Sequence, residues 1–435
     1  MNHSVQSSSL PTPSSTANSP RAFRALLFGQ FFGAANDNLL KGILSFMVIN
    51  GVWAGQLGPG GQGIVGLLFT LPFVLLSGYG GQLCDRHSKR SISILLKGLE
   101  IPFSAIAWLG FYFENLGLTL FALMLLSCQS AYFGPAKYGM IPEIVVPGRL
   151  SRANGWINMS TNIAVILATQ VAGWTSDHYS PINQNPRLGN PIDTQDPWLP
   201  GTLMIALALV GWISIRTLPP LPPGCRELRY QYNPLKIYVD ALKSMNANSV
   251  LPVVLAWGYF YFLAGIALMI IPEYSEVLSI PRGQASWILG VMAISIGLGS
   301  VITGRLARNS IGLRLIPMGA VGMSVCFALL GLISPTLTNA LVLVGCTGFF
   351  AGFYIIPLQS LMQLLSPSGE RGRFLGTANA LSFAFLSLSG VLYWLIRPAF
   401  GEQPQKIFLL CAALMSIVLV VWHHKGRKNM DPQIR

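Results

Sequence analysis

The chain has 435 residues, of which 52% are hydrophobic and only 10% are charged, whereas about 25% of the residues of a soluble domain are charged. Because this deficit extends over the whole length, the composition argues against a soluble domain and predicts a polytopic membrane protein. The formal net charge is +13. The basic residues stand between apolar stretches rather than in one patch, so no nucleic acid is predicted as a partner.

About twelve apolar stretches occur along the chain, each close to the ~20 residues that a helix needs to cross a bilayer. The alternation typical of a membrane barrel is not seen, so the spanning elements are expected to be helices. The predicted fold class is therefore an all-α polytopic membrane protein with about 12 transmembrane helices. The stretches lie near residues 22–49, 63–83, 92–112, 117–138, 153–174, 199–215, 247–271, 284–303, 315–333, 338–361, 374–396 and 406–422.

The basic residues alternate between connecting segments, so that most of them fall on one side of the predicted membrane. This is the positive-inside pattern, and it places both termini in the cytoplasm. The side of the membrane with few basic residues has only Arg187, Arg282, Arg397 and Lys406. The rich side has Arg21, Arg24, Arg86, Lys89, Arg90, Arg149, Arg152, Arg216, Arg226, Arg229, Lys236, Lys243, Arg305, Arg308, Arg314, Arg371, Arg373, Lys425, Arg427 and Lys428.

The longest basic loop divides the predicted helices into two sets of six. The two halves echo each other weakly at an offset of about 222–225 residues, as where Tyr132-Phe133-Gly134-Pro135 is matched by Tyr354-Ile355-Ile356-Pro357. Two similar halves around a midplane site are typical of a secondary transporter. The predicted parts are a disordered cytoplasmic tail at 1–20, an N-terminal bundle at 21–215, the central loop at 216–246, a C-terminal bundle at 247–422 and a basic cytoplasmic tail at 423–435.

Neither a metal site nor a cofactor is predicted. The six cysteines are scattered, and no two of them have the spacing of metal ligands. His423 and His424 are adjacent, so their side chains would point away from each other on a helix.

The loop after the second apolar stretch reads Gly81-Gln82-Leu83-Cys84-Asp85-Arg86-His87-Ser88-Lys89-Arg90. It resembles the hallmark loop of the major facilitator superfamily, with Ser88 where that pattern usually has Gly. The resemblance implies that Asp85 is a gate residue, whose carboxylate would meet a helix N-terminus near residues 371–374. A plain basic stop-transfer loop is the alternative. The second half has Ala307 near the matching place. The predicted gate residues are Gly81, Asp85, Arg86, Lys89, Arg90 and Arg373.

Charged side chains also occur inside apolar stretches, where each costs roughly 2.5–3.5 kcal/mol at a helix centre. Asp37 and Lys41 are spaced i, i+4, so one alternative is that they only neutralise each other. Asp37 lies ~21 Å and Lys137 ~14 Å above the ends of their helices. A Lys stem can span the ~7 Å between these heights. We therefore place Asp37 and Lys137 on the wall of a transport cavity.

Further polar residues extend this predicted cavity. Asn154, Asn158 and Asn162 form one stripe on a helix. Such a stripe serves either as packing contact between helices or as cavity lining, and the sequence does not decide between them. The second half offers mostly apolar and aromatic candidates. The predicted substrate-binding residues are Asp37, Lys137, Asn36, Asn38, Lys41, Tyr132, Asn158, Asn162 and Gln359.

Two segments resemble the bacterial lysophospholipid transporter family, a branch of the major facilitator superfamily. They are residues 30–40, Gln-Phe-Phe-Gly-Ala-Ala-Asn-Asp-Asn-Leu-Leu, and 132–139, Tyr-Phe-Gly-Pro-Ala-Lys-Tyr-Gly. The resemblance is sharp from about residue 22 to 176 and general beyond. It implies a protein of the bacterial inner membrane that flips lysophosphatidylethanolamine and related lysolipids from the outer to the inner leaflet by alternating access. A monomer is expected, although the sequence itself does not give the oligomeric state. Reacylation would follow in the cytoplasm, through functional coupling to an acyltransferase. Asp37 and Lys137 match the family's charged transport residues.

Three other functions compete with this interpretation. An enzyme is not expected, because no histidine has the Asp five residues later that acyltransfer would use, and no phosphate-binding Gly-rich loop appears. A receptor or scaffold would not need charges inside the membrane. A proton-coupled exporter of small amphipathic molecules, with Asp37 as its proton site, remains the alternative on the same fold.

Overall fold

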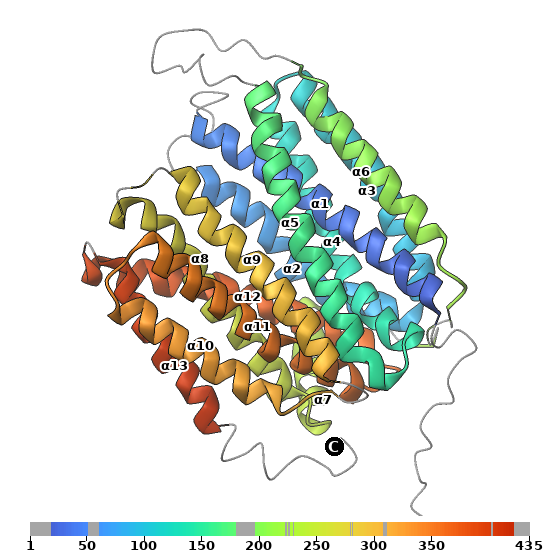
Figure 1. Cartoon of the computed structure of the whole chain (residues 1–435). Helices are drawn as coiled ribbons and strands as arrows, with labels where there is room; N and C mark the ends of the chain where they lie inside the picture. Colours follow the sequence, from blue (N-terminus) through green and yellow to red (C-terminus); the bar gives the residue numbers. More distant parts are fainter. Residues whose placement is uncertain are drawn as a thin grey trace, which may run out of the picture.

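The computed structural model describes residues 19–50, 61–179, 196–221, 224, 227–228, 230–278, 280, 282–307, 311–401 and 403–421. This part of the chain is helical and contains no strand (Figure 1). The helices are α1 (Pro20–Asn50), α2 (Gly61–Arg86), α3 (Lys89–Tyr112), α4 (Leu116–Ile144), α5 (Leu150–Tyr179), α6 (Leu199–Arg216), α7 (Pro234–Ala247), α8 (Leu251–Val277), α9 (Arg282–Leu306), α10 (Leu315–Leu332), α11 (Leu337–Leu365), α12 (Arg371–Ile396) and α13 (Ile407–Val421). Short 3₁₀ turns lie at Pro147–Arg149, Arg397–Phe400 and Pro404–Lys406.

Nine of the described helices are long and apolar enough to cross a membrane. Helices α1 and α5, which carry many polar residues, and the shorter apolar α13 bring the set to twelve. Helix α7 has only 14 residues and begins with the N-cap Asn233, whose side chain accepts from the Lys236 backbone N–H. The predicted all-α fold with about 12 long helices is therefore confirmed.

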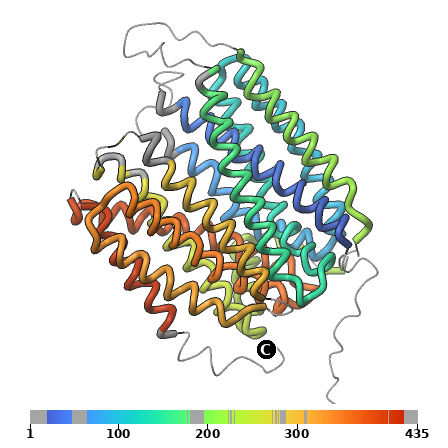
Figure 2. Tube along the Cα trace, viewed as in Figure 1, coloured from blue at the N-terminus to red at the C-terminus, as the bar shows by residue number. Residues whose placement is uncertain are grey.

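The helices form two bundles, α1–α6 and α8–α13 (Figures 1 and 2). Each bundle has its own apolar core. One core contains Leu39, Phe111 and Leu123 from the first bundle, and another contains Tyr354 and Phe408 from the second. The bounds of the two predicted domains stay a prediction. The predicted tails at 1–20 and 423–435 lie outside the described residues, apart from Ser19 and Pro20.

The bundles meet where α5 packs on α9 and α2 packs on α12 (Figure 2). At these crossings a glycine lets two backbones approach. A Cβ on Gly81 would clash with the Gly372 carbonyl, and one on Gly155 would clash with the Ser300 carbonyl. Near the other end of the bundles, a Cβ on Gly66 would meet no atom within 4 Å. In the described part of the chain, these glycines therefore bring the bundles into close contact at one end.

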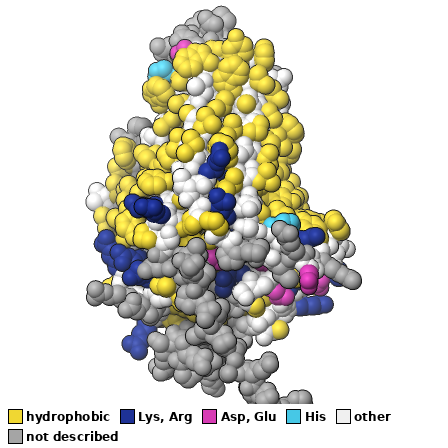
Figure 3. All heavy atoms as spheres, turned by 90° about the vertical axis from the view of Figure 1, so that its right-hand side faces the viewer, with side chains coloured by type: hydrophobic (Ala, Val, Ile, Leu, Met, Phe, Trp, Pro, Cys, Tyr) yellow, Lys and Arg dark blue, Asp and Glu magenta, His cyan; other side chains and the backbone are white. Residues whose placement is uncertain are grey.

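We call this the basic end. It is the end at which α1 begins and α2 ends at Arg86 and at which α12 begins at Arg371. In Figure 3 the Lys and Arg side chains gather in the lower part of the face shown, below a broad hydrophobic region. That distribution is typical of a helical membrane protein whose basic residues lie at one membrane surface.

Candidate functional site

Two neighbouring residues of α1 turn toward different helices, because successive residues of a helix lie about 100° apart. The Ser130 hydroxyl of α4 donates to Asp37 Oδ2 at 2.5 Å. Asn36 is fully buried, and its amide donates to Glu100 Oε1 at 2.9 Å and to Ser104 Oγ at 3.1 Å, both on α3. The site therefore joins α1 to both α3 and α4.

An ion pair inside α3 was not predicted. The Lys97 ammonium lies 2.6 Å from Glu100 Oε2, and the two side chains are only 2% and 1% exposed. Lys97 Nζ also lies 4.8 Å from the centre of the Phe133 ring on α4, and the Lys97 side chain packs directly over Gly33 of α1. The signal for this pair was a Lys and a Glu spaced i, i+3 within one apolar stretch.

Lys137 is buried on α4 and forms no ion pair within the described residues. Its ammonium lies 4.3 Å from the centre of the Tyr138 ring, a cation–π contact that partly replaces lost hydration. No ion pair joins Asp37 to Lys137 or to Lys41 in the described part of the chain. The Lys41 ammonium instead lies 4.6 Å from the centre of the Phe69 ring. Among the residues described, the site thus holds two cations with no carboxylate in contact.

The other predicted cavity residues are not gathered around Asp37. Asn38 donates to the Ala34 carbonyl of its own helix at 2.8 Å, and Asn162 donates to the Asn158 carbonyl at 2.9 Å. Asn158 Oδ1 accepts from Ser300 Oγ of α9 at 3.1 Å. Tyr132 is half-buried on α4, and Gln359 is buried in α11.

Asn154, the first residue of the polar stripe on α5, forms hydrogen bonds to the second bundle. Asn154 is fully buried and donates to Ser360 Oγ at 3.0 Å and to Gln363 Oε1 at 2.8 Å, both on α11. Gln363 donates back to Asn154 Oδ1 at 3.2 Å. We call these bonds the amide contact. Here the contact between helices, rather than cavity lining, accounts for the asparagine.

Asp85 meets the N-terminus of α12, where the sequence placed its partner. Its Oδ1 accepts from the Gly372 backbone N–H at 2.5 Å and its Oδ2 from the Arg373 backbone N–H at 2.7 Å. We call these bonds the carboxylate contact. A carboxylate is stabilised there because the first N–H groups of a helix are unpaired and carry the positive end of its dipole. Asp85 is only 5% exposed.

The remaining predicted gate residues surround this contact without binding Asp85 through their side chains. Lys89 pairs with Glu143 at 2.5 Å, and Arg373 pairs with Glu370 at 2.8 Å. Arg90 Nε donates to the Leu218 carbonyl at 2.7 Å, which ties α3 to the central loop. Glu143 was missed because its pairing with Lys89 depends on tertiary packing, whereas Glu370 was missed although it stands only three residues before Arg373.

Arg86 lines a small cleft at the basic end. The central loop forms one wall of this cleft through Leu228 and Tyr230. Burial raises the pKa of Tyr230 to about 12, so its phenol remains neutral. The other residues that line the cleft are Gln82, Asp85, Gly369, Glu370 and Arg373.

The sequence is similar to those of several curated transporters. The lysophospholipid transporter LplT of Photorhabdus laumondii is 26% identical over 79% of this chain and 80% of that protein. The lysophospholipid transporter LplT of Klebsiella pneumoniae is 24% identical over 93% of this chain and 96% of that protein. The similarity thus extends well beyond the segments that carry the sequence motifs.

Solved structures share the fold at low identity. The human organic anion transporter MFSD10 superposes with a TM-score of 0.74 at 12% identity, over 93% of this chain and 100% of that chain. The transporter FucP in its outward conformation gives a TM-score of 0.70 at 14% identity, over 90% of this chain and 96% of that one. The family model described as Major Facilitator Superfamily matches residues 26–391. This multi-pass membrane protein therefore belongs to the Major Facilitator Superfamily.

Proposed function

We propose that the protein moves lysophospholipids, among them lysophosphatidylethanolamine, from the outer to the inner leaflet of the bacterial inner membrane. One observation carries the proposal. Asp37 on α1 and Lys137 on α4 are charged groups inside neighbouring membrane helices that make no ion pair with each other among the described residues. A zwitterionic headgroup supplies the two missing partners, with its phosphate at Lys137 and its ammonium at Asp37.

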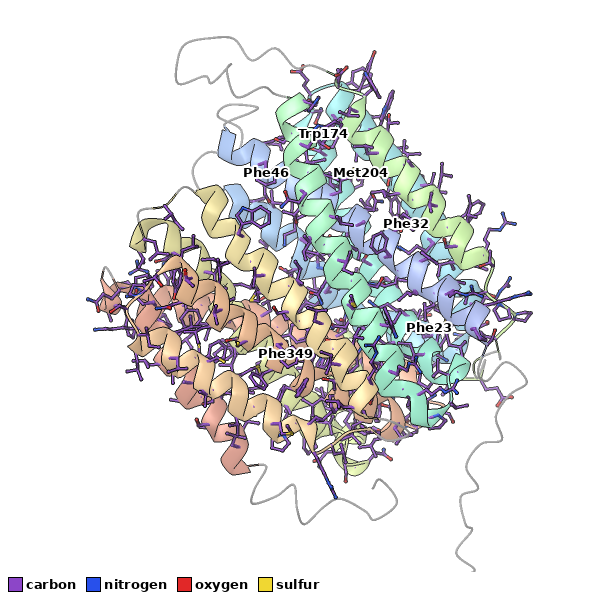
Figure 4. The ribbon with its side chains drawn as sticks, in the orientation of Figure 1. Phe23, Phe32, Phe46, Trp174, Met204 and Phe349 are labelled. Carbon is purple, nitrogen blue, oxygen red and sulfur yellow. The ribbon has the colours of Figure 1, made fainter. Side chains whose placement is uncertain are left out.

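The acyl chain of the lysolipid needs an apolar wall. We assign this wall to the second bundle, whose α11 carries a cluster of rings in which Phe349 lies 5.0 Å from Phe353 between ring centres. Figure 4 shows Phe349 in this bundle, beside α9. A charged wall on one bundle and an aromatic wall on the other suit an amphiphile better than a small polar solute.

The mechanism proposed is alternating access, with the bundles rocking about the midplane site. The positive-inside rule makes the basic end cytoplasmic and places both termini there. The structure would then represent a state that is closed to the cytoplasm, in which Asp85 acts as a gate residue at the α12 N-terminus. The lysolipid would be released to the inner leaflet when this contact opens.

Reacylation is assigned to a separate cytoplasmic acyltransferase that consumes the delivered lysolipid. The transporter itself would carry out no chemical reaction and would act as a monomer among the membrane lipids. This division follows from the sequence, in which no histidine has the Asp partner that acyltransfer would use.

The test is uptake of labelled lysophosphatidylethanolamine into membrane vesicles. Asp37→Asn and Lys137→Ala are each expected to reduce uptake at least tenfold while the protein stays folded, because each removes one charge partner of the headgroup. Glu273→Gln is the matched control. Glu273 pairs with Arg397 at 2.7 Å in the second bundle, away from α1 and α4, so near-parental uptake is expected.

Parental uptake in both site variants would refute the assignment of Asp37 and Lys137. If the parent moves no lysolipid, the function itself is refuted. Export of a small amphipathic dye driven by a proton gradient, without lysolipid movement, would support the competing exporter function instead.

A further inference from the structure

The Lys97–Glu100 pair has no role in the proposed headgroup contacts, yet it is the most deeply buried ion pair among the described residues. A fully buried pair is weak as a source of stability, since apolar residues of similar volume often stabilise a fold as well or better. Its presence in a membrane helix therefore points to a role other than stability.

The pair is directed at the two helices that carry the headgroup site. Lys97 packs over Gly33, which lies one turn before Asp37 on α1, and over the Phe133 ring, which lies one turn before Lys137 on α4. Glu100 accepts from the Asn36 amide at 2.9 Å. The pair thus lies directly behind the segment of α1 that presents Asp37.

Glu100 fixes the orientation of the Asn36 amide. A carboxylate paired with an ammonium only accepts hydrogen bonds, and Glu100 pairs with the Lys97 ammonium at 2.6 Å. Asn36 must therefore turn its NH₂ group toward α3, and its carbonyl oxygen must point elsewhere. That oxygen is buried and has no donor among the described residues.

A second acceptor nearby is also left open. Asp37 Oδ2 is bonded to Ser130, but Asp37 Oδ1 is buried without a donor in the described part of the chain. Two unpaired acceptors on adjacent residues suit a group with several N–H donors, such as a primary ammonium. A glycerol headgroup lacks that charge and gains less from the same oxygens.

We propose that Lys97 and Glu100 are positioning residues that give the site its preference for lysolipids whose headgroup carries an amine. They act through Asn36, the residue next to Asp37, whose carbonyl oxygen they keep turned away from α3 and without a donor among the described residues. This inference rests on the proposed lysolipid transport and adds to it a selectivity that the charges of Asp37 and Lys137 alone do not explain.

The variant Glu100→Gln changes the orientation of the Asn36 amide, while the side chain at position 100 keeps nearly the same volume and stays polar. The Lys97 ammonium can only donate, so it takes the oxygen of the introduced amide and leaves the NH₂ group of that amide facing Asn36. Asn36 must then turn its oxygen toward α3, which removes that acceptor from the site. We expect the KM for lysophosphatidylethanolamine to rise at least tenfold, while the KM for lysophosphatidylglycerol changes by less than threefold.

Glu100→Gln leaves Lys97 as a buried charge without a carboxylate partner, which destabilises the fold. A double variant therefore tests the inference in a protein without that charge. Lys97→Met with Glu100→Gln removes both charges and should fold. The introduced amide is then free to face either way. We therefore expect a smaller rise in the KM for lysophosphatidylethanolamine, of at least threefold, without a comparable rise for lysophosphatidylglycerol. Glu143→Gln is the matched control, since it breaks the other Lys–Glu pair, at the basic end. It should affect both lipids alike.

A selective loss for the amine lipid in either folded variant supports the inference. An equal change for both lipids, or a KM ratio within twofold of the parental value in the double variant, overturns it while leaving the transport function intact. A parent that moves neither lipid overturns the transport function, and the inference with it.

Discussion

Two of the contacts between the bundles at the basic end differ in their chemistry. In the carboxylate contact, α2 approaches α12 and a buried Asp85 accepts from two backbone N–H groups. In the amide contact, α5 approaches α11 and a buried Asn154 exchanges bonds with neutral side chains. The comparison shows that contacts at the same end of the bundles differ in charge, because individual residues decide how each contact is bonded.

The bond types predict that the carboxylate contact is the stronger of the two. Hydrogen bonds to a charged group contribute roughly 1.5–3 kcal/mol each and neutral ones roughly 0.5–1.5 kcal/mol. The helix dipole of α12 adds to the first and has no counterpart in the second. Opening of the basic end should therefore depend more on Asp85 than on Asn154.

The largest effect is expected from Asp85→Asn, which tests the stronger side of the comparison. The Gly372 and Arg373 N–H groups bond to different oxygens of Asp85. An amide replaces one of these oxygens with an NH₂ group, so one bond is lost in this geometry and the NH₂ group faces the positive end of α12. We expect the ratio of closed to open protein to fall about 100-fold. The buried Cys84 lies against Gly372. Its reaction with a membrane-impermeant thiol reagent would report the opening, in a background without the other native cysteines.

If Asp85→Asn leaves this thiol as protected as in the parent, packing alone closes the basic end. Glu370→Gln is the matched control, because it removes a carboxylate at the same end that pairs with Arg373 but accepts no bond from the α12 N-terminus. Its effect should be within threefold.

A smaller effect is expected from Asn154→Ala at the amide contact. The change removes the bonds to Ser360 and Gln363, and the neutral bonds lost correspond to about a tenfold fall in the closed-to-open ratio. The same thiol assay measures it. In combination with Gln363→Ala the effects should not add, since the two side chains share their bonds. Additive effects, or a loss as large as that of Asp85→Asn, would contradict the proposed ranking.

The sequence predicted some of these contacts and could not predict others. Asp85 was predictable with its partner, because its loop motif is local and α12 begins at a recognisable basic segment. Asn154 was found as one of a polar stripe, but its partner Gln363 is 209 residues away, and such pairings depend on how two bundles dock. The charges of Asp37 and Lys137 were found from their cost inside apolar stretches.

The Lys97–Glu100 pair shows a different limit. Both residues stand inside an apolar stretch, so the same cost argument applied to them, and the i, i+3 spacing was visible. Nothing in the spacing indicated that the pair faces Asn36, because the rotation of α3 about its axis is set by packing against α4 and α6. Composition and periodicity thus predict which helices form, and the orientation of each helix follows only from the assembled bundle.

The smallest effect is expected from Tyr238→Phe. This variant tests whether α7 stabilises only the carboxylate contact or the amide contact as well. The Tyr238 hydroxyl donates to the Val74 carbonyl at 2.7 Å and accepts from the Gly78 N–H at 3.2 Å, both on α2. On the other side of α7, Ser244 donates to Glu370 at 2.7 Å, just before α12. Helix α7 therefore braces the carboxylate contact, and no bond from it to α5 or α11 occurs among the described residues.

Loss of one hydroxyl should lower the closed-to-open ratio about threefold in the thiol assay. The decisive measurement is the combination with the other variants. With Asn154→Ala the effects should add, because the two sites share no partner, whereas with Asp85→Asn the effect should shrink, because the contact that α7 braces is already weakened. If the effect of Tyr238→Phe adds fully to that of Asn154→Ala and also to that of Asp85→Asn, α7 stabilises the basic end as a whole. The two contacts would then differ only in the strength of their bonds.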